Sequence, residues 1–335
     1  FMEKAIDVSP KDPILIDKFL EDAVEVDVDA VSDGKDTVIG GIMEHVEEAG
    51  IHSGDSACVL PPYNLNLEII NKIKENTYML SKELKVKGLI NIQFAIKDSK
   101  VYVLEVNPRA SRTVPFVSKA TGIALAKIAA KVMVGQSLEE AGLTKEKNID
   151  YIAVKESVLP FSRFSGVDII LGPEMKSTGE VMGIDQSFGK AFYKAQLAAG
   201  QLLPKEGLIF VSLKDGDKKL MLSVISQFSK IGFKIIATEG TKNALQSKNI
   251  PVELVGKISE GDKQILNYIK TNKIKLIINT PSGKIGHSDM RPIRSMAIMQ
   301  GIPCITTVPG AKALLEGMKA IILEEMEIKP LQEYY

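Results

Sequence analysis

The chain has 335 residues, of which 42 are basic and 42 are acidic, so its formal net charge at pH 7 is zero. This balance argues against a dedicated nucleic-acid-binding protein and against a polybasic membrane-surface module, because both normally carry a basic surplus. Hydrophobic residues make up 45% of the chain, and no apolar run is long enough to cross a bilayer. Cys58 and Cys304 allow at most one disulfide, so we expect a globular protein of the reducing cytoplasm.

The first part of the chain runs to about residue 135 and begins abruptly. An apolar strand is expected at Ile14–Ile16, yet neither a partner strand nor a nucleotide loop comes before it, which indicates a fragment or a processed product. Residues 25–31 alternate acidic and apolar side chains, which predicts a strand with one carboxylate-rich face and one buried face. Further expected elements are strands at 37–43, 88–97 and 100–106 and helices at 65–84 and 123–134.

The rest of the chain divides into a connecting segment, 136–204, and a domain at 205–335. In the connecting segment we expect strands at 151–158 and 180–184 and a helix at 187–201. After it, apolar strands alternate with helices, a pattern typical of a doubly wound parallel sheet. The predicted strands are 208–213, 234–238, 252–255, 275–280, 304–308 and 320–323, and the predicted helices are 217–231, 240–248, 261–272, 288–300 and 309–318.

Oxygen-bearing side chains lie on two neighbouring strands of the first part. Glu105 and Asn107 are two residues apart and so share a strand face, and Gln93 reaches the same space from the adjacent strand. This set suits Mg²⁺ that also holds phosphate oxygens, although a solvated sheet face is the alternative. Arg109 and Arg112 follow at once, and their guanidinium groups suit phosphoryl transfer.

Residues 88–94 (GLINIQF) followed by 105–109 (EVNPR) resemble the metal-binding core of ATP-grasp enzymes. The longer run 105–122, together with 40–46, 50–56 and 171–182, is similar to the second half of the large chains of the carbamoyl-phosphate synthetase family. The resemblance implies a partial ATP-grasp domain with an antiparallel sheet, in an ATP-dependent ligase that acts in arginine or pyrimidine supply. It also implies ATP with Mg²⁺ or Mn²⁺, and it leaves a requirement for K⁺ open.

The resemblance assigns a role to each matching residue. The metal ligands it implies are Gln93, Glu105 and Asn107; the ribose carboxylate is Glu25; the nucleotide-lining residues are His52 and Ser53; the arginines that face carbamate are Arg109 and Arg112. The earlier subdomain of the ATP site is missing from this sequence. We therefore expect the fragment alone to be inactive, and its partners to be the missing N-terminal part and a small glutaminase subunit.

Two polar loops follow strands of the last domain and predict a second site. Thr238 and Thr241 stand at the end of one strand, and Asn279 and Thr280 at the end of another, where doubly wound sheets bind ligands. Helix capping is the alternative for these hydroxyls. The domain resembles the methylglyoxal-synthase-like family, which implies that they contact nucleotide monophosphates such as UMP or IMP. Lys218 and Lys257 are then the countercharges.

The resemblance also implies an activator site for ornithine at Glu47, Asp55 and Glu156, where carboxylates suit an amine cation, and it implies self-association through the last domain. Two other functions stay open for this chain. One is a non-catalytic module for effector binding or oligomerisation. The other is a lyase of the methylglyoxal synthase type, which needs a carboxylate base beside a phosphate cradle.

Overall fold

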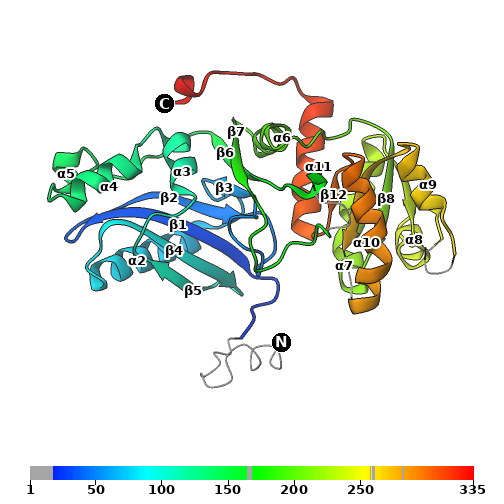
Figure 1. Ribbon diagram of the computed structural model, residues 1–335, viewed down its shortest axis with the longest axis horizontal. Helices are drawn as coiled ribbons and strands as arrows, with labels where there is room; N and C mark the ends of the chain where they lie inside the picture. The colour runs from blue at the N-terminus through cyan, green and yellow to red at the C-terminus, as the bar shows by residue number, and fades with distance from the viewer. Residues whose placement is uncertain (1–17, 164–167, 257, 259–260, 281–282) are drawn as a thin grey trace.

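The computed structural model describes residues 18–163, 168–256, 258, 261–280 and 283–335. The strand expected at Ile14–Ile16 and the predicted ligand Lys257 lie outside the described residues. The described chain forms an antiparallel seven-stranded sheet followed by a parallel five-stranded sheet, as the sequence predicts (Figure 1).

The strands of the first sheet lie in the order β5-β4-β1-β2-β3-β6-β7. Their bounds are β1 Val24–Asp33, β2 Thr37–His45, β3 Cys58–Leu60, β4 Lys87–Lys97, β5 Lys100–Asn107, β6 Ile152–Val158 and β7 Gly179–Asp185. The predicted strands at 25–31 and 37–43 pair as the antiparallel hairpin β1–β2, and those at 88–97 and 100–106 as β4–β5. The segment 136–204 therefore adds two strands to this sheet.

The two faces of this sheet carry different side chains, and strand β1 shows why. Val26 and Val28 alternate with Asp27 and Asp29, so the valines enter one face and the carboxylates the other. The apolar face packs on α2 (Leu67–Glu83) through Ile69 and Ile73. The opposite face packs on three helices, α3 Val114–Thr121, α4 Leu125–Met133 and α5 Leu138–Ala141.

The second sheet is parallel, with strand order β10-β9-β8-β11-β12. Its elements are β8 Leu208–Leu213, α7 Asp215–Lys230, β9 Lys234–Ala237, α8 Glu239–Gln246, β10 Glu253–Leu254, α9 Gln264–Lys270, β11 Ile274–Thr280, α10 Gly283–Met299, β12 Cys304–Ile305 and α11 Val308–Leu323. The strand predicted at 320–323 is wrong, because these residues form the last turn of α11. That helix is buried on several sides, against α6 and α7 among others, and a short apolar run with no polar face does not distinguish a strand from a buried helix.

Helix α6 (Phe188–Ala198) joins the two sheets. It packs on β6 and β7 of the first sheet and on α11 of the second part. One hydrophobic core consequently runs from Val154 through Phe192 to Val211 and Leu314. A short helix, η1 (Phe161–Arg163), follows β6 in the same region.

The segment after α11 returns to the first sheet (Figure 1) and ends in the short helix η3, Leu331–Tyr334. The Tyr334 ring meets the Tyr151 ring edge-on, with centroids 5.3 Å apart. The Tyr334 hydroxyl donates to the Ile184 carbonyl at 3.2 Å. Over the described residues, no helix has the length and hydropathy required to cross a membrane.

Candidate functional site

The polar face of the first sheet presents two rows of side chains. The strand register pairs Asp27 with Gln93 and Gln93 with Glu105, so these three stand in one row across β1, β4 and β5. A second row pairs Asp29 with Asn91 and Asn91 with Asn107. The predicted convergence of Gln93, Glu105 and Asn107 is therefore what the register produces.

A pocket of about 610 Å³ opens over these rows. Seven of the predicted nucleotide, metal and carbamate residues line it: Glu25, His52, Ser53, Gln93, Glu105, Arg109 and Arg112. Asn107 lies beside it and donates a hydrogen bond from its amide to Glu105. The loop at residues 50–54 forms one wall, and the segment at residues 109–113 forms another.

The donor set at this pocket fits a magnesium ion. Glu105 offers a carboxylate, and Gln93 and Asn107 offer amide oxygens, while the amide nitrogens make the hydrogen bonds to Ser53 and Glu105. Among the described residues, no group of three or more histidine, cysteine, aspartate or glutamate side chains forms a metal cage. A hard cation that keeps waters and phosphate oxygens in its shell needs few protein ligands, which is how Mg²⁺ is usually held.

Buried Asp29 fixes the arginine segment. Its carboxylate accepts hydrogen bonds from Ser111 Oγ at 2.7 Å and Thr113 Oγ1 at 2.6 Å, the residues on either side of Arg112. Asn91 donates to the same group at 3.0 Å. Burial raises the pKa of Asp29 to about 6 in spite of these bonds. The segment is thus anchored through the Ser111 and Thr113 hydroxyls, while the Arg109 and Arg112 side chains remain exposed.

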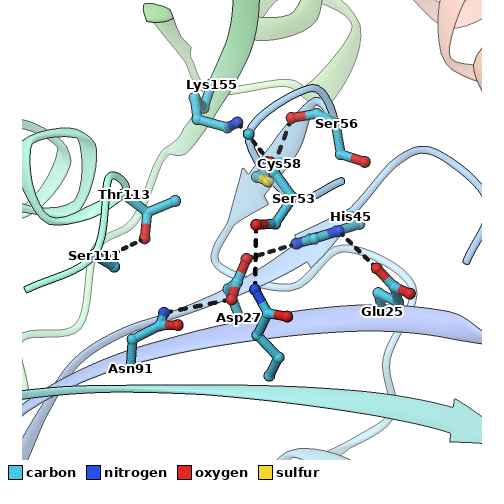
Figure 2. A network of polar contacts seen from close by, with 12 residues as sticks. Glu25, Asp27, His45, Ser53, Ser56, Cys58, Asn91, Ser111, Thr113 and Lys155 are labelled. Carbon is cyan, nitrogen blue, oxygen red and sulfur yellow. Dashed lines mark hydrogen bonds and ion pairs between the residues drawn. The ribbon is translucent and has the colours of Figure 1, made fainter. Parts of the chain in front are cut away.

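A second buried acid pairs with a histidine at the base of the pocket (Figure 2). His45 Nε2 lies 2.9 Å from Asp27 Oδ2, and His45 Nδ1 lies 3.6 Å from Glu25 Oε2. Burial opposes the charge on His45, but the neighbouring Cys58, Asp27 and Glu25 outweigh it and raise the pKa of His45 well above 6.5. The raised pKa favours the charged imidazolium beside Glu25, whose other oxygen accepts from the Gly50 amide at 3.0 Å.

A smaller pocket, of about 280 Å³, lies between the two parts of the chain. Glu47, Asp55 and Glu156, predicted to hold an amine cation, all line it. Glu47 accepts from Thr307 Oγ1 at 2.8 Å, and so connects the first sheet to the start of α11. Burial raises the pKa of Glu47, and burial together with Glu47 raises that of Glu156 to about 7.

The strand-end loops of the parallel sheet also come together, at the ends of β8, β9 and β11. Thr241 Oγ1 accepts from the Leu213 amide at 3.0 Å, and Thr280 Oγ1 accepts from the Lys214 amide at 3.1 Å. Thr238 is the N-cap residue of α8, although its hydroxyl makes no capping bond. Lys218 pairs with Asp215 at 2.6 Å. The hydroxyls and the predicted cation thus already have partners within the protein.

Sequence reasoning missed a buried arginine at this edge. Arg294 is fully buried, and it donates to both oxygens of Asp168 and, at 2.7 Å, to Asn279 Oδ1. Asp27 and Asp29 were also missed as site residues. Their alternation with valine was the available signal, but it does not reveal that the acidic face is itself buried.

Comparison with known proteins shows what this chain is similar to. Residues 1–141 match the family model described as "Carbamoyl-phosphate synthase L chain, ATP binding domain", and residues 220–306 match the "MGS-like domain". The chain is 55% identical to the carbamoyl phosphate synthase large chain of Archaeoglobus fulgidus, a match that covers 100% of this chain and 31% of that protein.

A second relative, from Methanocaldococcus jannaschii, is described as the C-terminal section of a carbamoyl phosphate synthase large chain. It is 51% identical over 99% of this chain and 56% of its own length. This chain therefore spans only part of the relatives it matches. Among solved structures, a biotin carboxylase domain of a single-chain bacterial carboxylase matches 59% of this chain and 56% of its own, with 14% identity and a TM-score of 0.45.

Proposed function

The chain belongs to the carbamoyl phosphate synthase large-chain family, whose C-terminal section it matches along its length, and we propose that it supplies the half-site that phosphorylates carbamate with MgATP. The observation that supports this most is that the row Asp27–Gln93–Glu105 lines one pocket together with Arg109 and Arg112, with Arg109 Nη2 3.9 Å from Glu105 Oε1. Carboxylate and amide oxygens together with guanidinium groups in one pocket suit a nucleotide triphosphate and its transferred phosphoryl group.

In this proposal each side chain has a limited task. Gln93, Glu105 and Asn107 hold Mg²⁺ (or Mn²⁺), which when bound neutralises charge on the nucleotide phosphates. Glu25, held by His45, accepts from the ribose hydroxyls, and His52 and Ser53 line the nucleotide site. Arg109 and Arg112 orient carbamate, whose oxygen forms a bond to the terminal phosphorus as the bond to the leaving ADP breaks. No covalent enzyme nucleophile is required.

The test uses the full-length large chain with its partner subunit, because the relatives are longer than this chain. ATP formation from carbamoyl phosphate and MgADP reports this half-reaction directly. Arg112→Met should lower kcat by about 100-fold, the usual cost of one donor to a developing charge. Lys131→Met, in helix α4 and away from the pocket, serves as the control. A full-length wild type without ATP formation would refute the proposal.

The last domain is proposed to bind regulatory nucleotides, UMP or IMP, at Thr238, Thr241, Asn279 and Thr280. Calorimetric titration of the chain as given, with UMP, IMP and MgATP in parallel, separates the candidates. Binding of a monophosphate that Thr241→Ala abolishes, without MgATP binding, is expected of a complete effector site beside half an ATP site. If a monophosphate binds but the full-length chain forms no ATP from carbamoyl phosphate, the chain is a non-catalytic effector-binding module. Conversion of a triose phosphate would instead favour a lyase of the methylglyoxal synthase type.

The smaller pocket is proposed to hold ornithine, with its amine against Glu47, Asp55 and Glu156. Because the pKa of Glu156 is about 7, a fall in pH protonates it, and affinity for the amine should decrease from pH 8 to pH 6. Glu156→Gln should bind weakly at both values. A glutaminase partner subunit, self-association and inactivity of this chain alone belong to the same proposal. It predicts that the full-length large chain is active where this chain is not. A requirement for K⁺ stays open.

A further inference from the structure

Lys155 on β6 is a fully buried cation that the proposed chemistry does not use. Its ammonium donates to the Ser53 carbonyl at 3.2 Å (Figure 2). It also lies 3.7 Å from Glu180 Oε1. Burial acts to lower its pKa, but Cys58, Glu180, Glu156 and Asp27 outweigh burial and raise it above 10.5. Burying a charge costs free energy, and the ammonium of Lys155 offsets this cost through one hydrogen bond to a peptide carbonyl and one ion pair.

The carbonyl that Lys155 holds belongs to the loop that forms one wall of the large pocket. Ser53 faces the pocket with its hydroxyl, which accepts from Gln93 Nε2 at 3.2 Å. The next residue is held from the same side, since the Gly54 carbonyl accepts from Ser157 Oγ at 2.7 Å. Strand β6 therefore holds this loop through hydrogen bonds from Lys155 and Ser157 to two successive peptide carbonyls.

Strand β6 also contributes to the smaller pocket, through Glu156, the residue between Lys155 and Ser157. Glu156 lines the smaller pocket, because successive side chains of a strand point to opposite faces. Asp55, which also lines the smaller pocket, continues the loop that Lys155 holds. Lys155 thus stands where the walls of the two pockets meet.

From this placement we infer that Lys155 is a positioning residue for the nucleotide. Its ammonium fixes the Ser53 peptide, so that Ser53 and His52 face the bound nucleotide triphosphate. The inference rests on the proposed function of the large pocket. Because the ammonium lies behind the loop and not among the residues lining the pocket, its effect should fall on nucleotide binding more than on the chemical step.

The experiment measures ATP formation from carbamoyl phosphate and MgADP by the full-length large chain with its partner subunit. For Lys155→Met we expect KM for MgADP to rise about tenfold, the usual loss for one charge-assisted hydrogen bond, with kcat within about threefold of the wild type. Lys155→Arg, which keeps a charged donor, should restore most of the affinity. Lys194→Met is a matched control, because Lys194 also donates to a backbone carbonyl, at 3.0 Å, and pairs with Asp185.

The outcomes separate this inference from the proposed function. An inactive wild type overturns the function itself. An active wild type with an unchanged KM in Lys155→Met, or an equal KM rise in Lys194→Met, overturns the inference alone. If Lys155→Met does not fold, as its melting curve would show, Lys155→Gln removes the charge but keeps a polar side chain and should also raise KM. An unchanged KM there also overturns the inference.

Discussion

The buried Arg294–Asp168 pair should contribute strongly to the stability of the chain. Arg294 is 0% exposed, whereas the Asp168 side chain is 26% exposed. The guanidinium donates to the carboxylate through Nε at 2.7 Å and Nη2 at 2.5 Å, and through Nη1 to Asn279. Breaking a wholly buried pair by removing one partner costs about 3–5 kcal/mol, and water access to Asp168 lowers this, so we expect Arg294→Met to cost about 3 kcal/mol.

Urea denaturation of the purified chain at pH 7 provides the measurement, with Asp168→Asn and the double variant completing a mutant cycle. If the pair is the source of the loss, the double variant should cost little more than Arg294→Met alone. The exposed Arg163→Met is the control and should stay within about 0.5 kcal/mol of the wild type. A loss below about 1 kcal/mol for Arg294→Met, or strict additivity in the cycle, would refute the reasoning.

The same pair has a defined pH dependence. Burial alone would raise the pKa of Asp168, but the hydrogen bonds and charge of Arg294 outweigh burial and hold it below 3.8. A lowered acid pKa contributes stability that is complete above the unfolded value and is lost as the pH falls through the folded value. Arg294→Met should therefore reduce the acid-induced loss of stability below pH 4, and equal acid profiles for both proteins would contradict the assignment.

Further predictions concern stability elsewhere in the chain. Tyr334→Ala removes the edge contact with Tyr151 and one hydrogen bond, and should cost about 1–3 kcal/mol in urea denaturation, whereas the exposed Gln332→Ala should cost nothing measurable. The pKa of His45 is raised, so its contribution to the free energy of unfolding is complete below pH 6.5 and is lost as the pH rises through the raised value. His45→Gln should abolish this loss of stability at high pH, and an unchanged pH profile of stability would disprove the assignment. Asp29 binds its proton more tightly when folded, so stability should increase as the pH falls through about 6, a trend that Asp29→Asn should remove.

Local patterns were sufficient for most of the first sheet and for part of the row of polar residues proposed to hold the metal ion. The spacing of Glu105 and Asn107 places both on one face of β5. The short turn before β5 would by itself set Gln93 opposite Leu104, and a bulge between Gln93 and Phe94 sets it opposite Glu105 instead. Strand period and hairpin geometry are properties of neighbouring residues, so they can be read from the sequence alone. The same holds for the alternation of strands and helices in the last domain.

Local patterns failed where burial depends on contacts from distant parts of the chain. The apolar periodicity of α2 includes Leu67 and Leu84, yet both are exposed, and the buried stripe runs through Ile69, Ile73 and Thr77. Helix α11 was divided into a helix and a strand, because nothing in residues 320–323 reveals that α6 packs against it.

The sequence by itself determined the two kinds of sheet and which side chains of a strand share a face, because a strand's period assigns its side chains to faces without knowledge of its neighbours. Only the tertiary structure decided which charged side chains are buried and which groups they contact. Arg294 meets Asp168, and Lys155 meets Ser53, across more than a hundred residues of chain. Such pairs depend on the packing of whole elements, and the free energy of a buried charge depends on every group around it.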